Sequence, residues 1–491
     1  MTRSNQDASR ARESWFGQSI QGPGGRIETP ECEEDIIDIL RNRDGFPSPV
    51  RPVGSRHSMT ECISAQAANG AEKRWGTLVD MTRFTKFSDG MQLRIDRRNM
   101  TATVPAGRTF YEVAHELAAQ LLQFRVNTEL GTLTMGAAAC GATKDSSFPG
   151  EYGQVCADVV GIRLVKPDGK LAEYREGDAE LDALRCSYGL FGIVTEVTFR
   201  VYPLEYISIE HDRLKPAGGS FTAAELKEAF DAWLGEDPRA VFLYLFPFRH
   251  RIVAELRRKP ALGGAKPKDE SLRMKVRNFF WEKGLHHWDN FTEKAQAHLH
   301  AQKLAAKLQD GFDSALGEFL DKALRLARIN PVSQIVDFDR PGRASRRFTF
   351  SMWAFPEDRF CTILPEYLQL RESHEAALRS SLPDVSYHIA GDRSSLLSYS
   401  YDGPVWTLDP ICPVNDAGSE WEHFLAVFND FCSERGGVPL LNQTPYLKRA
   451  HVERAFRSGA RDRLAEFESA RRRFDPGNRM LNAYFADLLA I

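Results

Sequence analysis

A chain of 491 residues is too long for one typical domain and predicts two or three. The composition is that of a globular protein, with 42% hydrophobic and 27% charged residues, and the formal net charge of −3 lacks the basic excess typical of nucleic-acid-binding proteins. The chain contains no run of about eighteen apolar residues, so no transmembrane helix is expected. The N-terminus lacks the apolar core of a secretory signal.

The eight cysteines are scattered along the chain and form no Cys-x-x-Cys pair. This distribution favours a reducing compartment and buried thiols over a disulfide framework or a zinc site. We therefore expect a cytoplasmic, soluble protein of mixed helices and strands, with neither nucleic acid nor a membrane among its partners.

Residues 1–204 combine helical and strand patterns. Apolar residues recur at helical spacing in 32–44 and 109–122, which predicts an amphipathic helix in each. An Asp168-Gly169 turn predicts a β-hairpin within 154–174. Further strands are expected at 51–53, 77–81, 92–96, 101–107 and 191–204.

The middle of the chain has a different character. Aromatic, strand-like runs at 240–248 and 346–355 flank a charged, helix-prone insert at roughly 258–330. The lysine-rich start of this insert is expected to be a solvated surface. Towards the C-terminus, the segment 461–474 predicts a helix, followed by an Asp-Pro-Gly-Asn turn and a short apolar stretch.

The segment 129–147, ELGTLTMGAAACGATKDSS, contains almost no large side chains. A run of glycine and alanine usually exists because something approaches the backbone closely. A tight helix–sheet contact and a flexible loop are alternative explanations. The chain has neither a GxGxxG motif that opens a helix after a first strand nor a GxxxxGK[ST] loop, so a Rossmann or P-loop nucleotide site is disfavoured.

The stretch RPVGSRHS (51–58) places His57 at the tip of a small, basic turn. Three interpretations compete for it. The turn is only a turn, its backbone N–H groups bind a phosphate as an anion-binding nest, or the imidazole is chemically engaged.

Six stretches of the first 204 residues form an ordered set: RPVGSRHS (51–58), LVDMTRF (78–84), TATVPAGRTFYEVAHEL (101–117), GTLTMGAAACGATKDSS (131–147), GQVCADVVGIRLVKPDG (153–169) and CSYGLFGIVTEVTFRVYPL (186–204). In their order and spacing, these stretches resemble the flavin domain of the vanillyl-alcohol oxidase/p-cresol methylhydroxylase (PCMH-type) superfamily, nearest its sugar-lactone and alditol oxidase branch. Weaker similarity continues in FLYLFPFRHRI (242–252) and FDPGNRMLNAYF (474–485).

The resemblance implies an α+β fold. A PCMH-type FAD-binding domain of two α/β subdomains is expected at 1–204. A substrate-binding or cap domain, built on an antiparallel sheet with flanking helices, is expected at 205–445. A C-terminal segment, 446–491, is expected to return to the FAD-binding domain.

The resemblance also implies how FAD is held. The turn at 53–58 wraps the pyrophosphate, and His57 carries a covalent bond to the 8α-methyl group of the flavin. In place of the branch's usual Thr-His-Gly this chain has Thr143-Lys144-Asp145, and Cys140 is expected to be a small buried thiol rather than a second link. The expected FAD-binding residues are Val53, Gly54, Ser55, Arg56, His57, Ser58, Gly131, Thr132, Thr134, Gly136, Ala137, Cys140, Gly141, Thr143, Gly192, Ile193, Val194 and Asn482.

The substrate side departs from the branch. Met352 stands where polyol and lactone oxidases carry a glutamate, and Asn442 and Gln443 stand near the expected His-Trp pair. Without those groups a polyol would bury unsatisfied hydroxyls, so a larger or less polar substrate is expected. The candidates for managing the hydroxyl proton are Lys448, Tyr446, Arg249 and His250.

The expected activity is oxidation of a hydroxyl-bearing small molecule, with O2 as the electron acceptor and a monomer or homodimer as the working form. A dehydrogenase with another acceptor and a flavin-binding partner protein with reduced catalysis remain alternatives. No metal is expected. His298 and His300, two positions apart on a predicted helix, point to different faces, and the nearby His286 and His287 complete no ligand set.

Overall fold

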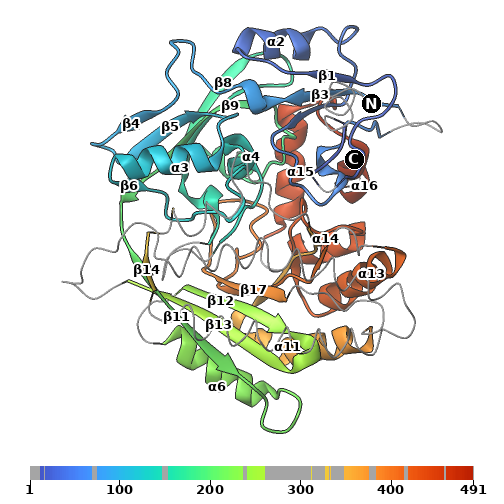
Figure 1. Cartoon of the computed structure of the whole chain (residues 1–491). Coiled ribbons are helices and arrows are strands. Elements are labelled where there is room, and N and C mark those ends of the chain that lie inside the picture. Colours follow the sequence, from blue (N-terminus) through green and yellow to red (C-terminus); the bar gives the residue numbers. More distant parts are fainter. Residues whose placement is uncertain are drawn as a thin grey trace.

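The computed structural model describes residues 12–489 except 16, 69–73, 146–152, 236–239, 260–310, 312–326, 331, 333–347, 375–382, 414–417 and 458–460. Within the described part, two sheet-containing regions lie one above the other, and helices of the C-terminal part extend along both (Figure 1). Among the helices in this part, none combines the length and the apolar character that a membrane span requires.

A three-stranded parallel sheet opens the N-terminal region. Its order is β1 (Arg26–Glu28), β3 (Thr77–Asp80) and β2 (Val50–Val53). Helix α2 (Glu33–Arg41) has acidic residues in its first turn and a basic one in its last, as the helix dipole favours, and its apolar face packs on β2 and β3. The 3-10 turns η1 (Glu61–Ile63) and η2 (Met81–Arg83) follow β2 and β3.

A five-stranded antiparallel sheet forms the rest of this region. Its order is β4 (Arg94–Asp96), β5 (Thr101–Pro105), β9 (Ile193–Arg200), β7 (Val159–Val165) and β8 (Leu171–Arg175). The other elements are α3 (Phe110–Ala119), β6 (Leu122–Gln123), α4 (Met135–Cys140), η3 (Val155–Asp158), α5 (Leu181–Leu184) and β10 (Tyr202–Pro203), which pairs with β6.

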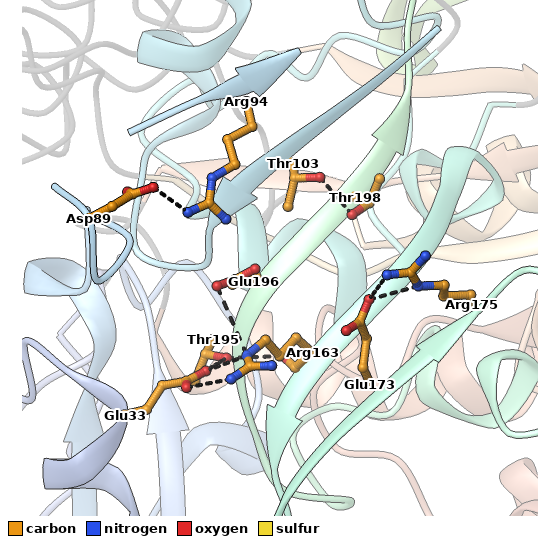
Figure 2. A network of polar contacts seen from close by, with 10 residues as sticks. All are labelled: Glu33, Asp89, Arg94, Thr103, Arg163, Glu173, Arg175, Thr195, Glu196 and Thr198. Atoms are coloured by element: carbon orange, nitrogen blue, oxygen red, sulfur yellow. Dashed lines mark hydrogen bonds and ion pairs between the residues drawn. The ribbon is translucent and has the colours of Figure 1, made fainter. Parts of the chain in front are cut away.

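Figure 2 shows how α2 is joined to this second sheet. Arg163 of β7 donates through Nε to Glu33 Oε1 at 2.7 Å and through NH2 to Glu33 Oε2 at 2.8 Å, and the hydroxyl of Thr195 on β9 donates to Glu33 Oε1 at 2.8 Å. A two-bond arginine–carboxylate fork has a fixed geometry. The contact therefore sets the position of α2 against the five-stranded sheet.

An antiparallel sheet of eight described strands dominates the middle of the chain. Its order is β14 (Ala327–Ile329), β11 (Ile207–Leu214), β13 (Arg251–Arg258), β12 (Ala240–Phe246), β17 (Asp384–Ile389), β18 (Val405–Leu408), β16 (Trp353–Pro356) and β20 (Val438–Pro439). Near it lie α6 (Ala223–Leu234), η4 (Pro247–Arg249), α11 (Glu357–Ser373), α13 (Ser419–Glu434) and a small ladder of β15 (Phe348–Phe350) with β19 (Ile411–Pro413).

Both faces of this sheet are covered. Successive side chains on a strand point to opposite faces, so each strand contributes to two different cores. On β12, Val241, Leu243 and Leu245 belong to the core shared with α6, α11 and α13. Phe242 and Tyr244 belong to the core of the N-terminal region. The sheet thus turns one face towards its own helices and the other towards the five-stranded sheet's side of the molecule.

The C-terminal helices α14 (Arg449–Phe456), α15 (Arg463–Phe474) and α16 (Ala483–Leu489) pack against the N-terminal region. Asn482 Nδ2 donates to three carbonyls around η1, those of Glu61, Cys62 and Ser64, at 2.8–3.2 Å. Arg479 donates to carbonyls at the end of α2. These contacts join segments more than 400 positions apart in the chain.

The expected α+β fold class, with an antiparallel sheet flanked by helices, is confirmed. The helices expected at 32–44, 109–122 and 461–474 correspond to α2, α3 and α15, each a few residues shorter. Capping explains the start of α3, where the side chains of Thr109 and Glu112 form a reciprocal capping box. Most of the insert expected at roughly 258–330 lies outside the described residues.

Candidate functional site

A large cavity lies where the eight-stranded sheet faces the N-terminal region. Its empty volume is about 1560 Å³, a figure that includes the mouth open to solvent. One wall comes from β2, α4 and the segments around them, and the other from β15, β17, β19 and residues 442–443.

The turn after β2 forms the part of the wall that contains the predicted histidine. Val53, Gly54, Ser55, Arg56, His57 and Ser58 all line the cavity. A Cβ at Gly54 would lie 2.1 Å from Thr134 Oγ1, so only glycine fits there. Arg56 has a φ of 62°, in the left-handed region. The tight backbone is therefore built for close approach.

His57 is buried, and its environment holds the ring in place. Nε2 lies 2.8 Å from Thr132 Oγ1, and the Ser55 hydroxyl donates to the carbonyl of Thr132. The ring of Trp15 lies 5.1 Å from the imidazole between centroids, and the Trp15 backbone N–H donates to the carbonyl of Arg56 at 2.8 Å. Contacts from two distant segments thus fix the orientation of the imidazole.

The small-residue run forms the adjoining wall around α4. Thr134, Gly136, Ala137, Cys140, Gly141 and Thr143 line the cavity. A Cβ on Gly136 would lie 2.9 Å from that of Ala106, so this helix packs closely on the chain behind it. Burial raises the pKa of the Cys140 thiol to about 12. A thiol of this kind is a poor nucleophile.

The remaining expected FAD-binding residues divide into two groups. Gly192 and Val194 line the cavity, whereas Ile193, between them on β9, points into the core beneath α2. Gly131 and Thr132 are outside the lining, and Thr132 reaches the site through its contact with His57. Asn482 is also outside the lining, where it supports the loop around η1.

None of the four residues expected to manage the hydroxyl proton lines the cavity. Lys448 is well exposed and pairs with Asp430 at 2.8 Å. Tyr446 is 48% exposed. Arg249 ends η4, and His250 Nδ1 lies 3.3 Å from Glu372 Oε1. The polar side chains that line the cavity come from other segments.

The wall opposite the histidine turn is mostly apolar. Phe348, Phe350, Val385, Tyr387 and Ile411 contribute to it. Leu130 and Leu133 add further apolar surface from the N-terminal region. Met352, which the sequence placed near this position, is fully buried and does not line the cavity.

A buried ion pair crosses the cavity between its two walls. Lys144 Nζ lies 2.8 Å from Asp409 Oδ2, and their side chains are 8% and 3% exposed. The same ammonium lies 3.5 Å from the ring centroid of Tyr387. Burial raises the pKa of Asp409, and the Lys144 charge opposes that rise. A carboxylate with a raised pKa is a stronger base than an exposed one.

Further polar groups surround this pair. The Tyr387 hydroxyl donates to Glu129 Oε2 at 3.3 Å, and burial raises the pKa of Tyr387 well above its usual value. Asn442 lines the cavity close to Gly141, and its Oδ1 makes no hydrogen bond within the described part of the chain. Gln443 lines the cavity beside it. These groups supply a phenol donor and an amide acceptor.

Sequence reasoning noted Lys144 but missed Glu129, Tyr387 and Asp409. No local motif surrounds the last two: Tyr387 lies within β17 and Asp409 directly follows β18, in a region of weak similarity. A buried aspartate directly after the strand VWTL was the available signal. Among the described residues no group of three or more His, Cys, Asp or Glu side chains is placed to hold a metal ion, and the four histidines between 286 and 300 lie outside the described residues.

Comparison with known proteins agrees with this geometry. Residues 26–175 match a protein family described as FAD binding domain. The chain is 24% identical over 240 residues to L-gulono-1,4-lactone dehydrogenase of Mycobacterium tuberculosis, a match that covers 49% of this chain and 50% of that protein. It is 27% identical over 176 residues to a long-chain alcohol oxidase of an uncultured marine euryarchaeote, covering 35% and 33%. The matches therefore span half or less of these curated relatives.

A solved structure of cholesterol oxidase from B. sterolicum has the same fold over almost the whole chain. The TM-score is 0.72 at 13% sequence identity, and the match covers 94% of each chain. A solvent-stable cholesterol oxidase gives a TM-score of 0.66 at 15% identity, covering 97% of each. The comparisons thus identify an FAD-binding domain at residues 26–175, in a chain whose fold is similar to that of the solved cholesterol oxidases.

Proposed function

We propose that this protein is an FAD-dependent oxidoreductase that oxidises a hydroxyl group of a largely apolar small molecule. One observation carries the proposal. A single cavity is lined on one side by the segments that the superfamily uses for FAD and on the other by a buried acid–base pair and aromatic side chains. Hydride transfer from an alcohol requires a bound cofactor that accepts the hydride and a side chain that accepts the hydroxyl proton.

The residues of the first wall fit FAD. The turn at 54–58 presents a tight backbone without bulky side chains at its start, and α4 presents glycine and alanine. These segments, with Gly192 and Val194, would hold the dinucleotide. When bound, FAD supplies the acceptor for the hydride that leaves the substrate carbon.

We further propose that His57 forms the covalent link to the flavin. A nucleophilic imidazole must be neutral, and a hydrogen bond on one ring nitrogen selects the tautomer. A proton on Nε2 held by Thr132 Oγ1 places the lone pair on Nδ1. Thr132 and Trp15 support this role by orienting the ring.

Asp409 is the proposed general base. Its carboxylate accepts the proton of the substrate hydroxyl, and its raised pKa makes that transfer more favourable. The Lys144 ammonium, 2.8 Å away, stabilises the negative charge that develops on the substrate oxygen. Tyr387 stays protonated and positions its hydroxyl towards Glu129.

The proposed substrate class follows from how few free hydrogen-bonding groups the second wall offers. Its polar groups already pair with residues of the N-terminal region, Asp409 with Lys144 and Tyr387 with Glu129. A polyol needs several further hydrogen-bonding groups, which the apolar surface of Phe348, Phe350 and Ile411 does not supply. We therefore propose a substrate with one reacting hydroxyl and an apolar body. The relatives named long-chain alcohol oxidase and cholesterol oxidase support this class.

We propose O2 as the electron acceptor, as in an oxidase. The relative named L-gulono-1,4-lactone dehydrogenase favours the second candidate, a dehydrogenase with another acceptor. Stopped-flow mixing of the reduced protein with air-saturated buffer separates the two. An oxidase reoxidises its flavin within the mixing experiment, whereas second-scale persistence of the reduced flavin identifies a dehydrogenase.

The proposed reaction is tested by anaerobic bleaching of the flavin. The purified yellow protein is mixed with matched panels of apolar primary and secondary alcohols and of polyols. Bleaching by members of the apolar panel is the expected result. Bleaching by polyols alone contradicts the proposed substrate class, and bleaching by neither panel favours a flavin-binding protein with reduced catalysis.

A further inference from the structure

Two consecutive residues of the N-terminal region each form a buried ion pair with the middle region of the chain. Lys144 pairs with Asp409, which lies just after β18. Asp145 Oδ1 accepts from Arg257 NH1 of β13 at 2.8 Å, and these two side chains are 1% and 3% exposed. The segment that carries Lys144 is therefore also held to the middle region through the next residue, Asp145.

Arg257 is itself held rigidly. Its Nε donates to Glu255 Oε1 at 2.8 Å, and residues two apart on a strand share a face. The second oxygen of Glu255 lies 3.4 Å from both Tyr244 Oη and His211 Nε2. The Arg257 guanidinium thus joins two buried carboxylates, that of Glu255 on its own strand and that of Asp145 beside Lys144.

Within its own region, Lys144 is held mainly through the backbone. Asp145 N donates to the carbonyl of Gly153 and Val155 N to that of Thr143, both at 2.9 Å, which pairs Lys144 with Gln154. This pairing sets the local conformation of the segment. It does not set the distance between Lys144 and Asp409, because Asp409 belongs to the other side of the interface.

We propose that Arg257 is a positioning residue, which places the Lys144 ammonium against Asp409 by holding Asp145 across the interface. The chemical value of this position rests on the proposed function, but the placement itself does not. Loss of the guanidinium leaves Asp145 and Glu255 buried without their shared cation, a state that drives the carboxylates apart or towards water. The segment then shifts, and Lys144 moves away from Asp409.

The test measures Lys144 directly. The purified protein, with the flavin it carries, is treated with trace acetic anhydride, and peptide mass spectrometry gives the acetylation rate of Lys144 relative to the exposed Lys170 of the same sample. The wild type is expected to react slowly at Lys144, which is 8% exposed and paired. Asp409→Asn is the positive control, because it removes the partner of Lys144 directly.

Arg257→Met is expected to raise the Lys144 rate about tenfold through local opening. Arg257→Lys gives an intermediate rise, because one ammonium does not replace the fork. Arg163→Met is the matched control. It breaks another arginine–carboxylate fork, whose two residues do not line the cavity, and is expected to leave the Lys144 rate unchanged (Figure 2).

If Arg257→Met fails to fold, Asp145→Asn tests the same contact from the other side and is expected to raise the Lys144 rate as well. An unchanged Lys144 rate in folded Arg257 and Asp145 variants overturns the proposal. An equal rise in Arg163→Met also overturns it, because the effect is then general loosening. No substrate enters this experiment, so failure of the proposed oxidation leaves its result intact.

Discussion

The imidazole Nε2 of His57 lies 2.8 Å from the hydroxyl oxygen of Thr132, a residue 75 positions further along the chain. The two residues belong to two segments that the resemblance assigns to FAD binding, both within the part of the chain that matches an FAD-binding domain. Their contact orients the ring that we propose as the attachment point of the flavin.

Thr132→Val removes the hydroxyl but keeps the shape of the side chain. The variant is expected to bind FAD yet to carry a smaller covalent fraction, because the tautomer and orientation of His57 are no longer fixed. The measurement is the ratio of flavin in the acid-precipitated pellet to total flavin. Thr132→Ser, which keeps the hydroxyl, should stay close to the wild type, and an unchanged ratio in Thr132→Val would remove Thr132 from the account.

Trp15 lies outside the segment that matches the FAD-binding family, but its ring packs on His57 and, edge-on, on Phe348 at 5.8 Å. Trp15→Ala is expected to lower the covalent fraction while total flavin changes less. Trp15→Phe keeps an aromatic ring and serves as the control. Equal covalent fractions in all three proteins would show that the ring has no part in orienting His57.

Gly54→Ala tests the tightness of the histidine turn. The added Cβ would lie 2.1 Å from Thr134 Oγ1, so the turn must move, with an expected loss of about 1–3 kcal/mol in the free energy of unfolding and a lower flavin content. Adding Thr134→Ala removes the clashing hydroxyl and should restore part of both. The control is Gly218→Ala, where a Cβ meets nothing within 4 Å. Chemical denaturation and the ratio of flavin to protein absorbance provide the two readouts.

Asp409→Asn tests the proposed base. The rate of anaerobic flavin reduction by an alcohol of the active panel is expected to fall by about 10²–10⁴-fold, the usual contribution of general base catalysis. Asp402→Asn, at an exposed aspartate, is the control. A decrease of no more than about twofold, much smaller than general base catalysis predicts, would mean that another group accepts the proton.

The pH dependence of the same rate tests the role of Lys144. Asp409 accepts a proton only when ionised, so activity is lost as pH falls through its pKa in the folded protein. Burial raises that pKa above 3.8, and the Lys144 charge opposes the rise. Lys144→Met removes the opposing charge and should move the acidic limb of the rate profile to higher pH. A limb that stays in place, or moves to lower pH, contradicts the assignment.

The sequence predicts the residues of the histidine-turn wall of the cavity better than those of the opposite wall. His57, Gly54 and Gly136 lie in short contiguous motifs whose chemistry is local, and all three line the cavity. Asp409 and Tyr387 reach the cavity only through the order of strands in the eight-stranded sheet, where β17 pairs with β12 and β18. Long-range pairing of this kind has no local signature.

Strand alternation explains a smaller difference. Gly192, Ile193 and Val194 are contiguous, but successive side chains on a strand point to opposite faces. Ile193 therefore belongs to the core beneath α2, whereas Val194 lines the cavity. Lys448 was expected at the site from the position of its segment, yet its ammonium turns outward to Asp430.

We propose that this cavity binds FAD attached to His57. Acid precipitation of the purified wild type and of His57→Ala tests it most directly. We predict a yellow wild-type pellet, and for the variant a colourless pellet with the flavin released into the supernatant. A wild-type protein without flavin, a wild-type pellet that loses its colour, or a variant pellet that keeps its colour would contradict the claim.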